Sequence, residues 1–402
     1  MRANKVPQIR FRGFSGEWED SGFSETFANI PNNTLSRDEL NYNFGLAKNI
    51  HYGDVLIKFG ELLDIQKQRI PFISNNDYVN KLKSAKLQNG DIVIADAAED
   101  EIVGKCTEIL NIERNTVLSG LHTIPVRPTQ SFASKYLGYY MNSSAYHNQL
   151  LPLLQGTKVL SISKSAIKNT MIYYPSDSLE QTKIGNYFQN LDHLIEQKEK
   201  KHKKLVQLKK AMLEKMFPKD GEDTPEIRFK GFSGEWEETE IGKIFNYIRP
   251  DEYIVKSTEY SKEFNTPVLT ANKAFILGFT NEKNTFNKPC IIFDDFTLDF
   301  KFVNFPYMVK SSAMKILILK DDKLNNLEFV YNLLKITKIE IMGHSRHYIS
   351  VVQKTNVYTP KKEEQTKIGN YFQKLDKLID LQLQELEKLK NIKKASLDKM
   401  FV

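Results

Sequence analysis

The sequence predicts an α+β protein in which two globular domains are joined by two long helices. The first observation is a phrase at residues 181–195 that returns almost letter for letter at residues 365–379, each time opening a long polar segment with helical spacing. A second phrase, at residues 7–19, returns at residues 225–237. Between these phrases lie short runs of β-branched residues bounded by Gly and Asp, which are strand signals.

The repeated phrases divide the chain into two repeat units, residues 7–217 and 225–401. The helix phrase recurs after 184 residues and the opening phrase after 218, so the middle of the first unit is longer by 34 residues (218 − 184). Because both units begin and end alike, the N-terminal phrase is the natural continuation of the C-terminal helix. We therefore expect a pseudo-twofold circular arrangement produced by duplication, since a solenoid needs at least three repeats.

The composition is that of an ordinary globular protein, with 402 residues, 27% charged and 41% apolar. No apolar run approaches the roughly 20 residues of a membrane span, and the N-terminus has no stretch like that of a secretion signal. Cys106 and Cys290 offer neither zinc spacing nor a disulfide framework, so we expect a cytoplasmic protein. The net charge of +7 leans weakly towards an anionic partner.

In the first middle region, about residues 20–175, turn residues and apolar runs alternate. We expect strands at residues 55–59, 92–95 and 123–126, a helical segment from Tyr136 towards Leu150, and a loop at Gly156 that leads into a strand.

The second middle region, about residues 240–360, repeats this order with different residues. We expect strands at residues 291–293 and 314–319 and a helix at residues 327–334. Asp294 and Asp295 follow the first of these strands, as Asp96 follows residues 92–95. The segment from Gly343 stands where Gly156 stands in the first unit.

Both long helices carry an apolar stripe with steps of three and four residues, near heptad spacing, which favours the pairing of two helices. About 35 residues make a rod of roughly 50 Å. We expect helix pairing or partner docking through these side chains: Ile184, Tyr187, Phe188, Leu191, Ile195, Ile368, Tyr371, Phe372, Leu375 and Ile379.

A basic run at residues 198–204 interrupts the first stripe, whereas residues 382–388 in the second copy are not basic. The run is either a solvated helix face or a contact with DNA phosphate or an acidic partner. Its absence from the second copy disfavours a role that both copies need.

These motifs resemble the specificity subunit of type I restriction-modification systems. The resemblance rests on the Pro-led helix openings at residues 175–184 and 360–368, on the doubled opening phrase, and on the turn and strand at residues 90–94. It covers nearly the whole chain. One local departure is Pro289-Cys290, which stands where the family has a Gly-Asp turn before a strand.

The resemblance implies two target-recognition domains held apart by two antiparallel conserved helices. In residue ranges these are a first domain, a helix, a linker, a second domain and a second helix, at residues 1–177, 178–217, 218–224, 225–361 and 362–402. It also implies two methyltransferase subunits on that frame and restriction subunits in the full complex, which methylate adenine or cleave DNA. No cofactor is expected on this chain, because S-adenosylmethionine, ATP and Mg would be bound by the partner subunits.

Two unlike readers on one frame would recognise a bipartite, asymmetric sequence in double-stranded DNA, and the helices would set the distance between its halves. Reading two segments of the major groove from one face needs centres about 34 Å apart. The expected DNA-binding residues follow the last glycine of each domain: Gly156, Thr157, Lys158, Ser161, Ser163, Lys164, Gly343, His344, Ser345, Arg346, His347 and Ser350. The alternative at both places is an ordinary loop that closes onto a strand.

Other cations are more readily read as surface charges than as phosphate contacts: Lys58, Arg69, Arg127, Lys310 and Lys315. Trp18 and Trp236 belong to the shared opening phrase, so we expect them in the core.

Catalytic motifs are absent from the sequence. There is no Asn/Asp-Pro-Pro-aromatic turn of a methyltransferase, no phosphate-binding Gly-rich loop and no histidine spacing typical of a metal site. We therefore expect a non-catalytic subunit without a metal. Two alternatives are a DNA-modifying enzyme, against which the missing motifs argue, and a coiled-coil scaffold whose globular domains bind protein.

Overall fold

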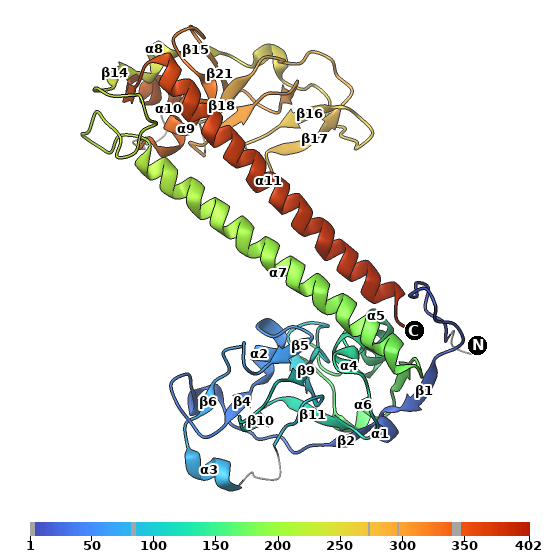
Figure 1. Ribbon diagram of the computed structural model, residues 1–402. Coiled ribbons are helices and arrows are strands. Elements are labelled where there is room, and N and C mark those ends of the chain that lie inside the picture. Colours follow the sequence, from blue (N-terminus) through green and yellow to red (C-terminus); the bar gives the residue numbers. More distant parts are fainter. Residues whose placement is uncertain (1–4, 82–85, 272–273, 296, 340–346) are drawn as a thin grey trace. The chain divides into compact units, whose positions relative to one another are not determined.

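The computed structural model describes residues 5–81, 86–271, 274–295, 297–339 and 347–402. The chain divides into two compact units: unit 1 is Met1–Lys198 with Glu385–Val402, and unit 2 is Glu199–Gln384. Each unit contains one globular domain and parts of both long helices, α7 (Ser178–Lys215) and α11 (Lys362–Lys399), which have 38 residues each (Figure 1). The folded units therefore do not follow the linear order of domain, helix, domain and helix.

The central sheet of unit 1 has five strands in the order β2-β11-β7-β9-β5, antiparallel except for the parallel pair β9–β5. Along β7 the side chains alternate between two apolar clusters, with Ile92 and Ile94 in one and Val93 and Ala95 in the other. A strand that is covered on both faces reads as a continuous apolar run, which is why its sequence signal was clear. The strands are β2 (Phe27–Asn29), β5 (Leu62–Asp64), β7 (Ile92–Ala95), β9 (Cys106–Leu110) and β11 (Thr123–Pro128).

A second sheet in unit 1 has the order β10-β4-β6-β3, and two strand pairs, β1–β13 and β12–β8, complete the domain. These strands are β1 (Glu19–Gly22), β3 (Leu40–Asn41), β4 (Lys48–Ile50), β6 (Phe72–Ile73), β8 (Ala97–Ala98), β10 (Val117–Ser119), β12 (Leu160–Ser161) and β13 (Met171–Tyr174). The short helices are α1 (Phe23–Thr26), α2 (Tyr52–Ile57), α3 (Asn76–Lys81), α4 (Tyr136–Tyr140), α5 (Ser144–Leu150) and α6 (Lys164–Ile167).

The strand predicted at residues 55–59 is wrong, because residues 55–57 lie in helix α2 and residues 58 and 59 follow its end. The side chain of His51 caps the helix by accepting a hydrogen bond from the backbone of Gly53 at 3.2 Å. Val55 in the helix and Phe59 just after its end are both buried. The glycine that suggested a turn before a strand therefore lies in the first helical turn.

The helical segment predicted from Tyr136 to Leu150 is present but broken into α4 and α5. The side-chain amide of Asn142, which follows α4, donates a hydrogen bond to the carbonyl of Cys106 at 2.8 Å. Ser143 then caps the new helix. Local side-chain hydrogen bonds of this kind compete with helix continuation.

Unit 2 repeats the architecture with a four-stranded sheet, β15-β21-β18-β19, a three-stranded sheet, β17-β16-β20, and the pair β14–β22. The predicted strands at residues 291–293 and 314–319 and the helix at 327–334 are confirmed as β18, β21 and α9, and β18 forms from Cys290 onwards. The strands are β14 (Glu237–Glu240), β15 (Phe245–Ile248), β16 (Thr266–Leu269), β17 (Ile276–Thr280), β18 (Cys290–Asp294), β19 (Phe300–Val303), β20 (Met308–Val309), β21 (Met314–Leu319) and β22 (Asn356–Thr359). The helices are α8 (Ile241–Ile244), α9 (Leu327–Ile336) and α10 (His347–Ser350).

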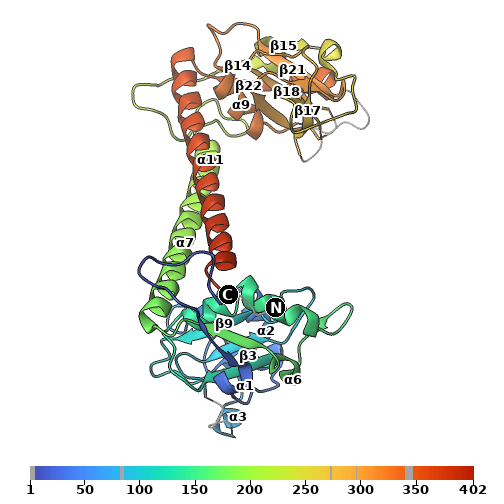
Figure 2. The ribbon, with the colours of Figure 1, turned by 90° about the vertical axis from the view of Figure 1, so that its right-hand side faces the viewer.

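The opening phrase of each unit is joined to the end of a long helix. In unit 1 the backbone N–H of Ile9 donates to the carbonyl of Lys399 at 2.9 Å, and Figure 2 shows this end of α11 beside the N-terminal segment. In unit 2 Ile227 donates in the same way to Lys215 at 2.8 Å. Each domain is therefore closed by the helix that the other repeat supplies, and the predicted circular order is confirmed.

The two tryptophans of the opening phrases are core residues, as predicted, with 2% and 3% of their surface exposed. The rings of Trp18 and Phe401 meet edge to face in unit 1, with centroids 6.3 Å apart. Trp236 and Phe217 form the equivalent contact in unit 2 at 6.1 Å. Aromatic pairs of this geometry add about 1 kcal/mol beyond burial, so they help to attach each helix end to its domain.

Each opening phrase contacts both long helices. It binds the end of one helix through its backbone and the start of the other through an arginine. Arg10 binds the buried carboxylate of Glu180 through two hydrogen bonds of 2.7 Å. Arg228 binds Glu364 at 2.8 and 2.6 Å in unit 2. Two-pronged contacts of guanidinium with carboxylate fix orientation as well as distance, so the helix starts are held rigidly.

Within each unit the two helix segments run antiparallel. In unit 1 the ammonium of Lys393 lies 2.6 Å from the carboxylate of Asp192, and in unit 2 Lys209 pairs with Asp376. These are equivalent residues of the two copies. Among the helices that the structure describes, none is long and apolar enough to cross a membrane.

Candidate nucleic-acid interface

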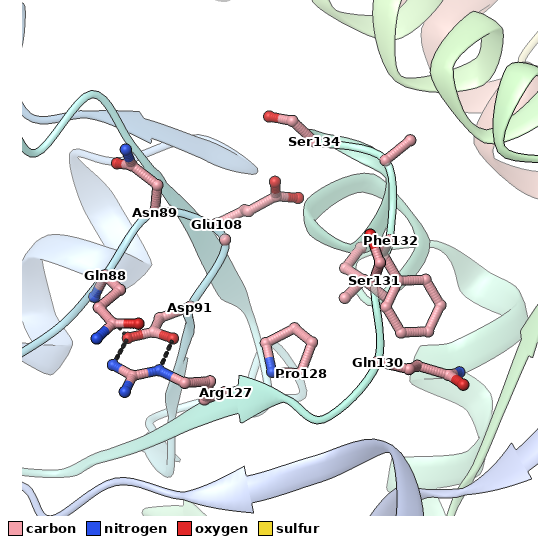
Figure 3. Close-up of a pocket in the computed structure, with 13 residues that line it drawn as sticks. Gln88, Asn89, Asp91, Glu108, Arg127, Pro128, Gln130, Ser131, Phe132 and Ser134 are labelled. Atoms are coloured by element: carbon pink, nitrogen blue, oxygen red, sulfur yellow. Dashed lines mark hydrogen bonds and ion pairs between the residues drawn. The ribbon is translucent and has the colours of Figure 1, made fainter.

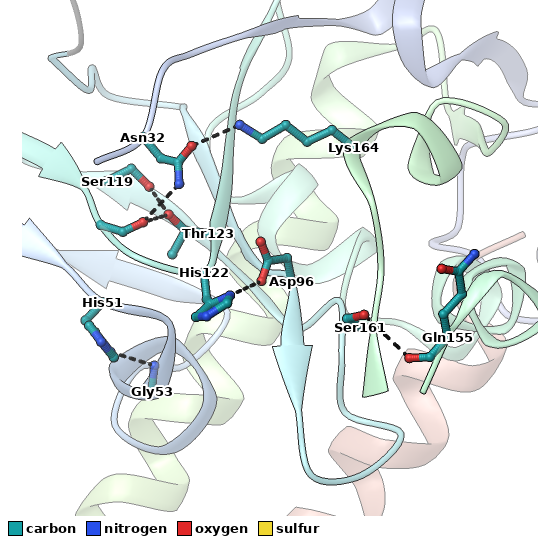
Figure 4. Close-up of polar contacts among 11 residues, drawn as sticks. Asn32, His51, Gly53, Asp96, Ser119, His122, Thr123, Gln155, Ser161 and Lys164 are labelled. Atoms are coloured by element: carbon teal, nitrogen blue, oxygen red, sulfur yellow. Dashed lines mark hydrogen bonds and ion pairs between the residues drawn. The ribbon is translucent and has the colours of Figure 1, made fainter. Parts of the chain in front are cut away.

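The candidate reading loop of unit 1 is the tip of a tight hairpin closed by Gln155 and Ser161, which Figure 4 shows side by side. Their backbones exchange hydrogen bonds of 2.9 and 2.8 Å. Gly156 has a φ of +115°, and a Cβ at this position would lie 2.0 Å from the carbonyl oxygen of Val159. Only glycine fits this turn, so the sequence fixes the conformation of the tip.

All the residues predicted to bind DNA in unit 1 are exposed: Gly156, Thr157, Lys158, Ser161, Ser163 and Lys164. Ser163 also has a structural role, because its hydroxyl accepts from the backbone of Ala166 at 3.1 Å and caps α6. The ammonium of Lys164 donates to Oδ1 of Asn32 at 2.9 Å, which holds the lysine over the domain surface. The hairpin thus presents hydroxyl and cationic groups together.

Asp96 and His122 lie next to this loop, and the sequence did not identify either as a site residue. Nδ1 of His122 and a carboxylate oxygen of Asp96 are 3.2 Å apart and point toward one another (Figure 4). The backbone of Ile162 donates to the carbonyl of Asp96 at 2.8 Å, so the pair is attached to the loop. Burial raises the pKa of Asp96, and the neighbouring imidazole opposes that rise. Asp96 directly follows a buried strand, and this position could have indicated it as a candidate surface residue. No motif or spacing in the sequence indicated His122.

Aromatic and charged side chains continue the surface away from the loop. The ring of His122 meets Tyr52 edge to face at 5.2 Å, and Tyr52 contacts His51 at 4.6 Å. His51 lies 3.3 Å from the guanidinium of Arg37, which pairs with the buried Asp54 at 2.7 Å. Burial, with the charge of Arg37, lowers the pKa of His51. We call the surface formed by residues 155–164, Asp96, His122, Tyr52 and Arg37 the polar strip of unit 1; His51 is buried and contacts both Tyr52 and Arg37.

Unit 2 has a counterpart of this arrangement at Asp295. Its backbone N–H donates to the carbonyl of Ala313 at 3.3 Å, just as Asp96 donates to His122 at 3.1 Å. The aspartates therefore occupy equivalent places at the end of the central strand, and alanine replaces the histidine. In unit 2 the carboxylate pairs instead with Lys315 at 3.1 Å.

The predicted DNA-binding residues of unit 2 are only partly covered by the structure. Gly343, His344, Ser345 and Arg346 lie outside the described residues. His347 begins α10, and Ser350 ends it with an exposed side chain. Tyr348 in the same helix donates its backbone N–H to Asp295 at 3.1 Å, so the segment is held by the equivalent aspartate, as in unit 1.

Several cations considered as phosphate contacts have partners within the protein. Arg127 binds Asp91 through two hydrogen bonds of 2.8 and 2.7 Å, and the carboxylate raises the pKa of the guanidinium. Lys315 is buried beside Asp295. Lys310 is exposed and donates to the hydroxyl of Tyr260 at 3.0 Å.

A cavity of about 330 Å³ lies between the Asp91–Arg127 pair and the start of α4 (Figure 3). Its buried carboxylate, Glu108, accepts hydrogen bonds from the backbones of Lys135 at 2.6 Å and Gly138 at 2.9 Å. Burial raises the pKa of Glu108 to about 7. Because both oxygens are engaged with the first turn of α4, we interpret this residue as structural. Across the parts of the chain that the structure describes, no three metal-ligating side chains gather.

The apolar residues predicted for helix pairing or docking mostly face their own domain. Ile184, Phe188 and Leu191 are buried in the core of unit 1, Ile368 and Phe372 are buried in the core of unit 2, and Leu375 is buried as well. Tyr187, Ile195, Tyr371 and Ile379 are partly buried, and the hydroxyl of Tyr187 lies 3.0 Å from that of Ser396 on α11. The buried side chains bind the helices to the domains and present no surface to a partner.

Other apolar residues of the helices are exposed, and the sequence did not single them out for docking. Leu194 and Ile392 in unit 1 are 44% and 38% exposed, and Leu208 and Leu378 in unit 2 are 41% and 48% exposed. Leu194 and Leu378 are equivalent residues of the repeat, as are Leu208 and Ile392. Leu194 and Ile392 both lie next to the ion pair of Lys393 with Asp192 in unit 1. Leu208 and Leu378 lie in the same way next to the pair of Lys209 with Asp376 in unit 2.

The two similar domains are each closed by a helix end of the other repeat and bear unlike polar groups at equivalent places. The model of the type I restriction modification DNA specificity domain matches residues 49–207 and 233–391. The chain therefore belongs to the family of type I DNA specificity domains and contains two of them.

Known relatives agree with this assignment. The EcoR124I/EcoR124II specificity subunit of Escherichia coli is 39% identical over 136 residues, which span 32% of this chain and only 33% of that subunit. The putative MjaX specificity subunit of Methanocaldococcus jannaschii is 24% identical over 351 residues, covering 80% of this chain and 81% of the relative. The solved type I S subunit from M. genitalium shares the fold, with a TM-score of 0.63, 99% coverage of both chains and 16% identity.

Proposed function

We propose that this chain is the non-catalytic specificity subunit of a type I restriction-modification complex and that it recognises a bipartite, asymmetric DNA sequence. In this proposal the domains at residues 1–177 and 225–361 each read one half of the target. The observation that carries the proposal is the conserved frame with unlike surfaces: Asp96 faces His122 in unit 1, whereas Asp295 faces Lys315 in unit 2. The two repeats have the same architecture but different side chains at equivalent surface positions. This combination suits two domains that recognise different DNA sequences.

The polar strip of unit 1 has the groups that base recognition requires. Side chains that donate and accept hydrogen bonds read base edges in the major groove, and cations position the protein on phosphates. Thr157 and Lys158 at the hairpin tip, with Lys164 beside them, would supply both kinds of contact. The glycine turn would present them in one conformation, which lowers the entropic cost of binding.

The long helices at residues 178–217 and 362–402, with the linker at 218–224, would set the spacing of the two half-sites. Their firm attachment supports this role: Arg10 and Arg228 bind the helix starts, and the opening phrases bind the helix ends. A rigid joint at each domain would make the length of the target spacer a property of the frame rather than of the domains.

We infer that the exposed apolar pairs dock two copies of one methyltransferase subunit. Leu194 with Ile392 and Leu208 with Leu378 are equivalent sets, so a partner that fits one would fit the other. S-adenosylmethionine, ATP and Mg would be held by the methyltransferase and restriction subunits, since this sequence has no motif for them. A complex that acts on cellular DNA would work in the cytoplasm.

Stoichiometry measured by mass photometry tests the docking surfaces. The double change Leu208→Ser and Leu378→Ser should reduce the number of bound methyltransferase subunits from two to one and leave the other site intact. Leu179→Ser is the matched control, because Leu179 is 67% exposed on α7 but is replaced by Glu363 in the other repeat. Two bound subunits in the double variant would contradict the assignment.

Selection of bound duplexes from a random library, by the chain together with methyltransferase subunits, tests the function itself. The proposal predicts two short specified segments separated by an unspecified spacer of fixed length. A scaffold whose domains bind protein would show no sequence preference, and methyl transfer by the purified chain alone would establish an enzyme instead.

A further inference from the structure

A turn in unit 1 holds an aromatic side chain out in solvent. Phe44 is 72% exposed, between β3 and β4. The side chain of Asn41 accepts hydrogen bonds from the backbones of Asn43 at 2.9 Å and Phe44 at 3.0 Å. Leu46, two residues later, is 57% exposed.

The neighbouring residues make this turn rigid. A Cβ on Gly45 would lie 2.7 Å from both the carbonyl oxygen of Ile73 and Cβ of Phe72, so the backbone packs closely against β6. The backbone of Leu46 donates to the side chain of Asn76 at 3.1 Å. Burial of apolar surface gains about 25 cal/mol per Å², so a ligand that covers this fixed, outward-facing ring would gain binding free energy.

Cations flank the turn. The hydroxyl of Tyr42 accepts a hydrogen bond from Lys58 at 2.9 Å, and the guanidinium of Arg69 lies 4.8 Å from the centre of the Tyr42 ring. The carboxylate of Asp54 is 2.8 Å from Lys58 and is buried, so it offers little charge to solvent. Lys58 and Arg69 are both exposed, which leaves a positive rim around an apolar centre.

The turn is continuous with the polar strip of unit 1. Asp54 joins Lys58 to Arg37, at 2.8 and 2.7 Å, and the exposed Arg37 is itself part of the strip. A ligand that lies along the strip therefore meets the aromatic turn at its end. Positive charge on the rim and continuity with the candidate interface both favour a polyanion over a protein surface.

We propose that Phe44 is a wedge that inserts between stacked base pairs of duplex DNA beside the half-site bound by unit 1. Lys58 and Arg69 bind the phosphates on either side of the opened step. The inference rests on the proposed function, because it takes unit 1 to be bound to DNA. Apolar wedges of this kind unstack one base step and bend the duplex, and stacking of a base on an aromatic ring strengthens binding.

Duplexes carrying 2-aminopurine at successive positions in and beside the selected target test the wedge, with the full chain and its methyltransferase subunits. One flanking position should brighten on binding, because 2-aminopurine fluoresces when it is unstacked. Phe44→Ala should abolish this signal and weaken binding by about 10- to 100-fold, the range expected for one aromatic stacking contact. Leu324→Ala, a change at a similarly exposed apolar residue of unit 2, should alter neither quantity.

A salt titration tests the rim. Arg69→Gln should reduce the slope of log affinity against log salt by about 1, as expected for the loss of one phosphate contact. An unchanged slope would remove Arg69 from the interface and contradict the proposal.

The outcomes separate the wedge from the function on which it rests. A selective complex whose Phe44→Ala variant binds equally well, with an unchanged fluorescence profile, overturns the wedge alone. A complex without sequence preference overturns both proposals. If Phe44→Ala instead prevents assembly with a protein subunit, the turn docks protein and the wedge is wrong; circular dichroism confirms that the variant is folded.

Discussion

Alanine at Gly369 should destabilise unit 2, whereas alanine at the equivalent Gly185 should leave unit 1 nearly unchanged. Both glycines lie one residue after the first buried isoleucine of a long helix. A Cβ at position 369 would lie 2.4 Å from Oδ1 of Asn326 and 3.0 Å from the backbone nitrogen of Phe329, which are the two atoms of the α9 cap. At position 185 the nearest atom is Cβ of Lys135, at 3.1 Å.

The expected free energies follow from these contacts. Replacing glycine by alanine inside a helix gains about 0.5–1 kcal/mol. In unit 1 the segment at Lys135 would have to move by a few tenths of an ångström, and the cost of that movement would offset the gain. The net change in free energy of unfolding should therefore stay within about 0.5 kcal/mol. In unit 2 the lost cap costs about 1 kcal/mol and the displaced helix about 1–3 kcal/mol, for a net loss of about 1–3 kcal/mol.

Hydrogen exchange is the appropriate assay, because a chain of two units does not have a single unfolding free energy. Amides of α9 should exchange about 5- to 150-fold faster in Gly369→Ala, while those of α4 should keep wild-type protection in Gly185→Ala. Wild-type protection of α9 in the first variant, or an equal loss in both, would refute the reasoning from close helix approach.

Three further predictions concern the pocket, the core and the spacing. The unfolded chain ionises Glu108 near its ordinary pKa of 4.5, but burial raises the folded pKa to about 7, so the stability of unit 1 should fall by about 3 kcal/mol as pH rises between these values. Glu108→Gln should remove that fall, and denaturation midpoints that vary equally with pH in both proteins would contradict it. Phe188→Ala should cost unit 1 about 3–5 kcal/mol, measured by exchange in its core strands, because the ring is fully buried; a loss below 1 kcal/mol would argue against its place in the core. Inserting about four residues, one helical turn, near Lys200 should change the spacer of the selected target; an unchanged spacer would exclude the helices as its determinant.

Much of the fold followed from signals that are local in sequence. The buried strands β7 and β21 were predicted because a short apolar run between turn residues is typical of a buried strand. The long helices were predicted from the repeat and from the stripe at Ile184 and Phe188, and burial of these residues confirms the stripe. The circular order followed from the two offsets of the repeat, and the bond from Ile9 to Lys399 confirms it.

The errors arose where a distant residue decides the local structure. The segment after Gly53 has the composition of a strand, but it forms a helix whose buried Asp54 pairs with the distant Arg37. The helix after Tyr136 breaks because Asn142 binds Cys106, a residue on another element.

The candidate site was predicted only in part for the same reason. The candidate reading loop could be located from Gly156, whose turn requires glycine. The partnership of His122 with Asp96 depends on the register between β11 and β7, which no local pattern reveals. The apolar stripe indicated that the helices pack against something, but it could not say whether Phe188 faces a partner or its own domain.

The most direct test of the account is the modification pattern of a domain exchange. Residues 20–175 would be replaced by the corresponding segment of another specificity subunit, and methylated adenines would be located across the genome of a host that carries the complete system. The account predicts that one half of the target changes, while the other half and the spacer are kept. Change in both halves would contradict the claim that two independent readers share one frame.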